Sequence, residues 1–297
     1  RFYNASLAAT SLGSARAFLS SLYEYHVPKT ILLGIDPWWF RPGRSGQYAD
    51  KGNIQQVVDF NYQAFISTAL SSGASMRVLN SLMGENLRQK TDPLGGRRPV
   101  GYHAALTGNG FRADGSYQYG DILTGRNRSM KTRHMGAAEN FAFYREQASL
   151  SLGRFSYTGD IDSAEQALLR EIIQQAQSRG INLVLFFPPI AAKVMEAVRN
   201  TPNQAAYFNK VRKVVSAIAT EFRVEFHNFH DLGELGIADS HTIDGVHVDE
   251  IASLAMLRRM IDESPVLASL YDQKGIESLE KILEDRENWA GPKRILP

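Results

Sequence analysis

Apolar residues along the chain follow two spacings in turn, and this alternation predicts strands that are each followed by helices. Short apolar runs, typical of strands in a parallel sheet, occupy residues 2–8, 29–36, 181–189 and 224–229. Apolar residues at helical spacing predict helices near 18–22, 54–70, 75–83, 137–150, 162–180, 207–222 and 251–261. Asp162 and Glu165 have the spacing of a capping box at the start of one of these helices, and Gly180 marks its end. Strands that alternate with helices imply a parallel sheet with helices on both faces, where ligands bind beyond the carboxyl ends of the strands.

Residues 85–135 break this pattern, because they are rich in Gly, Arg and aromatic residues and show no clear period. An insertion of this length inside a compact domain is usually functional or disordered. We therefore expect one α/β domain over residues 1–269 that contains the insertion, followed by a peripheral helix and tail over residues 270–297.

Part of the insertion, "GFRADGSYQYGD" at residues 110–121, has two interpretations. A Gly-rich loop can close over a substrate, and Arg112 would then be a substrate contact. The same residues also suit a surface hairpin with a turn at Asp114 and Gly115.

Composition and charge narrow the class of protein only slightly. The 297 residues are 43% hydrophobic and 22% charged, as in an ordinary globular protein, and the formal charge of +2 is too small to indicate nucleic acid as a partner. The chain contains no cysteine, which excludes disulfides, thiol nucleophiles and cysteine metal ligands but fits either the cytosol or an oxidising envelope compartment. Because the sequence opens abruptly on a predicted strand, we expect residue 1 to be an internal position of a longer precursor.

The segment "HTIDGVHVDE" (241–250) contains the strongest candidate for chemistry, since Asp244 precedes His247 by three residues just ahead of a helix. A carboxylate that accepts the Nδ1–H of an imidazole holds its tautomer, and the other ring nitrogen can then act as a general base. The alternative is a structural turn in which Asp244 begins the turn and His247 packs at the helix start.

Other polar residues are weaker candidates. His241 and Asp239 could form a second pair, but we favour the interpretation of a hydrogen-bonded loop histidine. His227 and His230 have a spacing that only weakly suggests a metal site, and a structural role is the better interpretation.

Serines at the start of the first predicted helix have two interpretations. Ser11 or Ser14 could be a nucleophile, because a helix N-terminus stabilises negative charge. Serine is also an ordinary N-cap residue, and we favour that role for both.

Two adjacent tryptophans, Trp38 and Trp39, follow the strand "ILLGID" directly. If the indole faces are exposed they would stack on sugar rings, which suits a polysaccharide. Large aromatic side chains are mostly buried, however, so packing in the core is at least as good an interpretation.

The segment "DGVHVDEIASLAMLRRMI" resembles the last conserved block of the SGNH (GDSL-type) hydrolase superfamily, in which D-x-x-H supplies the acid and base of a Ser-His-Asp triad. "FYNASLAATS" is similar to an earlier block of that superfamily, with Asn4 matching and Ala9 where a glycine N–H normally serves the oxyanion hole. "ILLGID" resembles the block G-x-N, with Gly34 matching and Asp36 in place of the oxyanion-hole asparagine. An ionised Asp36 would repel an oxyanion, so we expect it to point away, to be protonated, or to serve substrate or structure instead.

"PKTILLGIDPWWF" and "LFFPPI" look most like the divergent envelope branch of the superfamily, which includes alginate O-acetyltransferases and the D-alanyl transfer proteins of teichoic acid synthesis. The resemblance implies a flavodoxin-like three-layer α/β/α fold and an enzyme, as the full-length protein, that transfers O-acyl groups to an envelope or exported polysaccharide or removes them. It implies that the nucleophilic serine lies upstream of residue 1, and that Ala9, Asp36, Trp38 and Arg112 are oxyanion or substrate candidates.

The same resemblance sets expectations about partners and location. It implies a periplasmic or extracytoplasmic protein, anchored by an N-terminal segment that precedes residue 1. The expected partners are a polysaccharide or acylated carbohydrate and a membrane-bound acyl-donor protein, with no metal or organic cofactor. The alternative function is a non-catalytic carbohydrate-binding or polysaccharide-assembly protein that retains the fold.

Overall fold

A computed structural model describes residues 11–45, 109–111, 117–119, 141–242, 244–271 and the positions 274, 275, 277, 278 and 281. Contacts divide the chain into two compact units. The smaller unit comprises Arg1–Ala8, Gln55–Lys131 and Arg294–Pro297, and the larger comprises Ala9–Ile54 and Thr132–Lys293. The strand predicted at 2–8 and the helices predicted at 54–70 and 75–83 lie outside the described residues.

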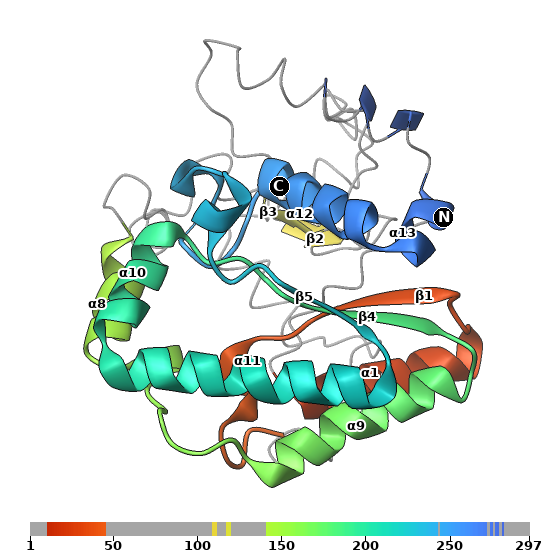
Figure 1. The fold of residues 1–297 in the computed structure, drawn as a ribbon, viewed down its shortest axis with the longest axis horizontal. Helices are drawn as coiled ribbons and strands as arrows, with labels where there is room; N and C mark the ends of the chain where they lie inside the picture. The colour runs from red at the N-terminus through yellow and green to blue at the C-terminus, as the bar shows by residue number, and fades with distance from the viewer. Residues whose placement is uncertain are drawn as a thin grey trace, which may run out of the picture. The chain divides into compact units, whose positions relative to one another are not determined.

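The larger unit contains a three-stranded parallel sheet in the order β1-β4-β5 (Figure 1). Its strands are β1 (Thr30–Gly34), β4 (Asn182–Phe187) and β5 (Glu225–Asn228). Leu32 of β1 lies opposite Val184 of β4, and Leu185 of β4 lies opposite Phe226 of β5. These three strands confirm the predictions for residues 29–36, 181–189 and 224–229.

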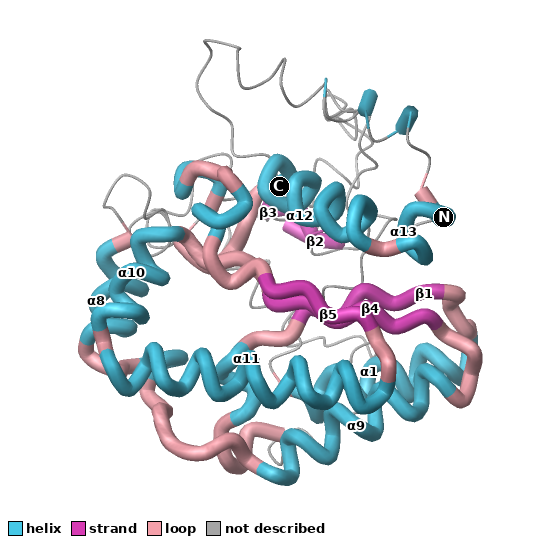
Figure 2. The backbone as a smooth tube through the Cα atoms, viewed as in Figure 1, coloured by secondary structure: helices cyan, strands magenta, loops and turns pink. Residues whose placement is uncertain are grey.

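Side chains of the central strand β4 alternate between two apolar clusters, because successive residues of a strand point to opposite faces. Leu183, Leu185 and Phe187 belong to a cluster that includes buried residues of α1, α9 and α11. Val184 belongs to a second cluster with Met260 and other residues of α12 and α13, against which Phe186 also packs. Helices therefore cover both faces of this sheet, as Figure 2 shows.

The helices of the larger unit follow the expected order along the chain. They are α1 (Leu12–Tyr25), α8 (Ala142–Ser149), α9 (Ser163–Gln177), α10 (Ala192–Asn200), α11 (Pro202–Phe222), α12 (Glu250–Glu263) and α13 (Pro265–Leu270). Four short 3-10 helices join them, namely η1 (Pro37–Phe40), η2 (Gly153–Phe155), η3 (Leu232–Leu235) and η4 (Asp239–His241). The long helix expected between the last two strands is preceded by α10, because the chain turns at Thr201 and Pro202 begins α11. No helix in the described ranges combines the length and apolar character needed to cross a bilayer.

The capping box expected at the start of α9 is only half present. Asp162 caps the helix by accepting a hydrogen bond from the backbone N–H of Ala164 at 2.9 Å. Glu165 does not bond back to the cap, because its buried carboxylate accepts hydrogen bonds from the backbone N–H of Ser45, at 2.7 Å, and from the Ser45 hydroxyl. Ser45 in turn accepts a hydrogen bond from the N–H of Gly13 at 2.9 Å, so Glu165 joins α9 to α1 and to the segment after η1.

The smaller unit is described only at an antiparallel pair of short strands, β2 (Asn109–Phe111) and β3 (Tyr117–Tyr119). Phe111 lies opposite Tyr117, which agrees with the hairpin interpretation of this segment. Arg112, Asp114 and Gly115, between the two strands, lie outside the described residues.

His230 belongs to the core of the larger unit. Its ring stacks on Phe187 with centroids 4.0 Å apart and planes 1° apart, and only 6% of the residue is exposed. Burial, assisted by the positive charge of Arg212, lowers the pKa of His230 to about 3. The imidazole is therefore neutral at physiological pH, which agrees with the structural role expected from the sequence.

His230 should make the protein less stable in mild acid. The unfolded chain takes up a proton near pH 6.5, whereas the folded chain resists it down to about pH 3, so the unfolded state binds more protons between these values. We expect His230 to reduce the free energy of unfolding by about 1.4 kcal/mol per pH unit in this window. Urea titrations at several pH values should show a flatter dependence for His230→Phe than for the wild type, and no such change for the exposed control His26→Gln. An unchanged dependence in His230→Phe would contradict this role.

Candidate functional site

Asp244 and His247 form a hydrogen-bonded pair in the loop between η4 and α12. His247 Nδ1 lies 2.7 Å from Asp244 Oδ2, and the other carboxylate oxygen accepts the backbone N–H groups of Val246 and His247 at 3.0 and 2.9 Å. Asp244 is 5% exposed, whereas the side chain of His247 is 59% exposed. The turn therefore buries the carboxylate and presents the imidazole to solvent.

This arrangement determines which ring nitrogen of His247 is available. A carboxylate only accepts hydrogen bonds, so Nδ1 carries the proton that points at Asp244, and Nε2 of the neutral ring is left with a lone pair. Burial alone would raise the pKa of Asp244, but the hydrogen bond and charge of His247 and the two backbone N–H groups outweigh it and lower the pKa. Asp244 thus stays ionised, and it holds the His247 ring in one tautomer and one orientation.

Neighbouring aspartates hold the loop in place. Asp239 caps α10, since its carboxylate accepts the backbone N–H groups of Ala192 and Lys193 at 2.6 and 3.1 Å. Asp249 caps α12 and also lies 2.9 Å from Nδ1 of His241. His241 is therefore held by Asp249, which agrees with the interpretation of a hydrogen-bonded loop histidine.

The segments that follow the parallel strands β1 and β4 both reach the pair. Asp36 follows β1, and the chain after β4 reaches the pair where Ala191 donates its backbone N–H to the Gly245 carbonyl at 2.8 Å. The position fits the rule that ligands of such sheets bind beyond the carboxyl ends of the strands.

Packing against α8 and α10 leaves little room for a side chain at Gly245. Its φ of +97° is a backbone conformation that favours glycine, and a Cβ there would lie 3.0 Å from Val194 Cγ2 and 3.2 Å from Phe141 Cδ1. Phe141 itself has a positive φ of 56°, which is unusual for a bulky residue. The turn that carries His247 is therefore fixed by steric contacts as well as by hydrogen bonds.

Asp36 lies near the pair. Protein atoms surround most of its side chain, and part of the residue remains accessible to solvent. Burial raises its pKa to about 6, while the charges of Arg154 and His247 and a hydrogen bond from Trp38 each lower it. The structure thus brings Asp36 near His247, as expected for a residue of the site. At neutral pH Asp36 is mostly ionised.

The two tryptophans are both buried, with 8% of Trp38 and 4% of Trp39 exposed. The interpretation as an exposed stacking pair is therefore wrong, and core packing is correct for both. The Trp38 ring contacts Phe155 edge-on at 6.1 Å, and its side chain hydrogen bonds Asp36. Trp38 contributes to the site through that bond, while Tyr207 anchors η1 by donating its hydroxyl to the Pro37 carbonyl at 3.1 Å.

Ser11 forms a helix cap, as favoured from the sequence. It is completely buried, its hydroxyl accepts the backbone N–H of Ser14 at 3.1 Å, and the two residues complete a capping box for α1. Ser11 therefore cannot meet a substrate in this conformation. Asn4, Ala9 and Arg112 lie outside the described residues.

Arg154 is a residue of the site that the sequence did not single out. Its guanidinium lies over the rings of Trp38 and Tyr144, at 4.9 and 4.8 Å from the ring centroids, and its charge acts on Asp36. Arg154 belongs to no motif, and the rings that hold it come from η1 and α8. No local pattern could have indicated the contact.

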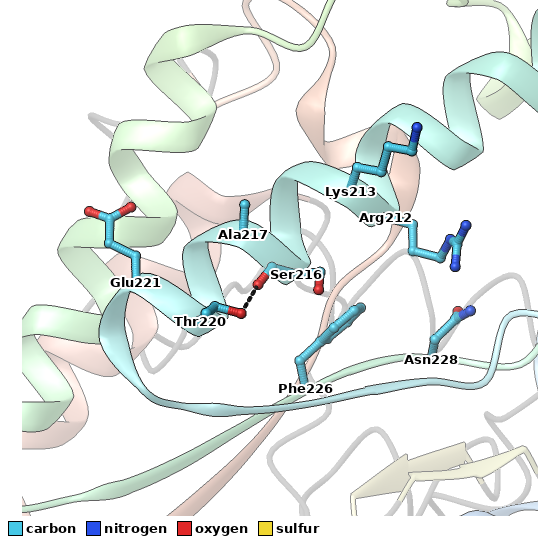
Figure 3. Close-up of a pocket in the computed structure, with 8 residues that line it drawn as sticks. All are labelled: Arg212, Lys213, Ser216, Ala217, Thr220, Glu221, Phe226 and Asn228. Carbon is cyan, nitrogen blue, oxygen red and sulfur yellow. Dashed lines mark hydrogen bonds between the residues drawn. The ribbon is translucent and has the colours of Figure 1, made fainter.

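A surface hollow of about 730 Å³ lies elsewhere, between α11 and β5 (Figure 3). It is lined by Arg212, Lys213, Ser216, Ala217, Thr220, Glu221, Phe226 and Asn228. In Figure 3 Lys213 and Glu221 point away from Phe226, and the Thr220 hydroxyl donates to the Ser216 carbonyl at 2.9 Å. The hollow does not include the Asp244–His247 pair, so we take the pair as the functional site on the basis of its chemistry.

Within the part of the chain that the structure describes, no group of three or more His, Asp or Glu side chains is arranged to hold a metal ion. Protein-family models, curated proteins and solved structures gave no match when each set was compared with the chain.

The raised pKa of Asp36 predicts a cost in stability. The carboxyl of Asp36 keeps its proton up to about pH 6 in the folded protein but only up to about pH 3.8 in the unfolded chain. The protonated carboxyl therefore contributes to the free energy of unfolding at low pH, and this contribution is lost as the pH rises through 6. We expect Asp36→Asn to be more stable than the wild type by up to about 3 kcal/mol at pH 8, with the difference disappearing below pH 4. Chemical denaturation across this range tests it, with the exposed Glu24→Gln as control. A difference that does not change with pH would show that Asp36 is not the titrating group.

Proposed function

We propose that the full-length protein is an SGNH-type enzyme that transfers O-acyl groups to an envelope or exported polysaccharide, or removes them. The observation that carries this proposal is the 2.7 Å contact between Asp244 and Nδ1 of an imidazole whose side chain is 59% exposed at the carboxyl edge of a parallel sheet. An oriented histidine of this kind is suited to activating a hydroxyl nucleophile.

The proposed reaction has two halves, the formation of an acyl-serine and its breakdown, and His247 takes up and returns one proton in each. Nε2 takes the proton of a serine hydroxyl while the serine oxygen attacks the acyl carbonyl carbon, and the carbonyl electron pair moves onto its oxygen. When that pair returns, the alcohol leaves and receives the proton from His247. A sugar hydroxyl or water then attacks the acyl-serine by the same sequence, which gives the new ester or the free acid.

Other parts of the proposal rest on the resemblance alone. The complete fold would be flavodoxin-like with three layers, and the mixed helix and strand architecture with an open parallel sheet is compatible with it. The nucleophilic serine would belong to a segment that precedes residue 1. The carbohydrate substrate, an extracytoplasmic location and a membrane-bound acyl donor follow from the envelope branch that the sequence resembles.

A second function, carbohydrate binding without catalysis, is favoured by one observation. Asp36 places a second carboxylate near His247, and it is mostly ionised at neutral pH. A negative charge at that point opposes an oxyanion and would be expected in a site that has lost acyl transfer.

Hydrolysis of p-nitrophenyl acetate by the full-length protein separates the two functions. Acyl chemistry predicts a clear wild-type rate that falls by about 10²–10⁴-fold in His247→Ala, because the general base is lost. Asp244→Asn should also lose most of the rate, since the amide cannot hold the same tautomer or stabilise the imidazolium. The exposed His26→Ala serves as a matched control and should keep the wild-type rate.

Equal rates in the wild type and His247→Ala would rule out the acyl-transfer proposal. A glycan-binding screen of the same proteins would then test the second function. Thermal unfolding of each variant checks that a lost rate does not reflect an unfolded protein.

A further inference from the structure

Arg154 is held between two buried aromatic rings. The guanidinium carbon is 4.9 Å from the centroid of Trp38 and 4.8 Å from that of Tyr144, and both rings are less than 10% exposed. Cation–π contacts of this kind favour a fixed position for the charge. A guanidinium that is already ordered loses little freedom when it binds a ligand.

The hydrogen-bond donors of Arg154 are not used in the described structure. No hydrogen bond or ion pair of its side chain occurs among the described residues, and the side chain is half-buried, so solvent reaches it. A guanidinium offers five N–H donors. Several other arginines of the larger unit form ion pairs with carboxylates, namely Arg16, Arg170, Arg199, Arg258 and Arg259.

The same residues connect Arg154 to the Asp244–His247 pair. Trp38, which contacts Arg154, hydrogen bonds Asp36, and the charges of both Arg154 and His247 act on that carboxyl. Tyr144 is one turn along α8 from Phe141, which packs against the site of Gly245 in the turn of the pair. The guanidinium and the imidazole are therefore both near Asp36.

The proposed reaction creates a negative charge that needs hydrogen-bond donors. As the serine oxygen bonds to the acyl carbon, the carbonyl electron pair moves to oxygen and forms an oxyanion, which reverts to a carbonyl when the alcohol leaves. Asp36 and Asp244 are acceptors when ionised, and the side-chain donor of Trp38 is already used by Asp36. Among the described residues of the site, Arg154 combines a positive charge with unused donors.

We propose that Arg154 is a catalytic residue that donates hydrogen bonds to this oxyanion. The role rests on the proposed acyl chemistry and adds the group that stabilises its charged intermediate. It also accounts for the presence of Asp36 in a working site, because the positive charge of Arg154 opposes the repulsion that an ionised Asp36 exerts on the oxyanion.

The test measures kcat and KM of the full-length protein for p-nitrophenyl acetate in the wild type, Arg154→Ala, Arg154→Lys and the surface control Arg170→Ala. We expect Arg154→Ala to lose about 10²–10³-fold in kcat with little change in KM, because an oxyanion donor acts mainly in the transition state. Arg154→Lys should recover part of the loss, since it keeps the charge but not the planar set of donors. Arg170, which pairs with Glu221 on the surface, should be replaceable without effect.

Addition of millimolar guanidinium chloride gives a second readout. The slot between Trp38 and Tyr144 should bind the free cation in Arg154→Ala and restore part of kcat, whereas the rates of the wild type and His247→Ala should not rise. A structural role for Arg154 would not give this rescue.

The possible failures are distinguishable. If His247→Ala loses the rate but Arg154→Ala keeps kcat, or if Arg154→Ala loses kcat without rescue by guanidinium, the role of Arg154 is overturned and the acyl chemistry stands. If His247→Ala keeps the wild-type rate, the proposed function fails and the role of Arg154 fails with it.

Discussion

The buried carboxylate of Asp244 is the group on which the geometry of the site depends. An ion in this position is costly to bury unless hydrogen bonds replace the lost water, and Asp244 obtains them from two backbone N–H groups and one imidazole within its own turn. The turn can close so tightly because Gly245 has a positive φ that other residues rarely adopt. The direction of the His247 ring is therefore set by hydrogen bonds within four residues of chain, in a turn that Val194, Phe141 and Ala191 also hold in place.

The parallel sheet brings segments that are distant in the sequence close to that turn. The side chains of β4 alternate between two apolar clusters, and helices cover both faces of the sheet. The polar residues of the site therefore lie beyond the ends of the strands. Asp36, which follows β1, then lies near His247, and Ala191, which follows β4, hydrogen bonds the turn between η4 and α12. The site combines a rigid local pair with partners supplied by long-range packing.

This division explains what could be predicted from the sequence. The caps at Ser11 and Asp162 and the Asp244–His247 pair depend on neighbours a few residues away, and local spacing indicated each of them. The strands pair with distant segments, but each is marked by its own continuous apolar run, which is a local feature. Glu165 bonds Ser45, which lies 120 residues earlier, in preference to the helix end beside it, so local spacing predicted its partner wrongly. Arg154 was missed for the same reason, because its two aromatic contacts come from separate segments.

Ser45 and Phe141 are the described residues of the larger unit that flank residues 46–140, a stretch that includes Gln55–Lys131 of the smaller unit. Glu165 holds Ser45 by hydrogen bonds, and Phe141 is fixed by its contact with the turn at Gly245. Both ends of the intervening stretch are thus attached to the larger unit by that unit's own side chains. Since the entropy of closing a loop grows only slowly with its length, a change in the length of residues 46–140 is expected to alter the free energy of unfolding of the larger unit only slightly.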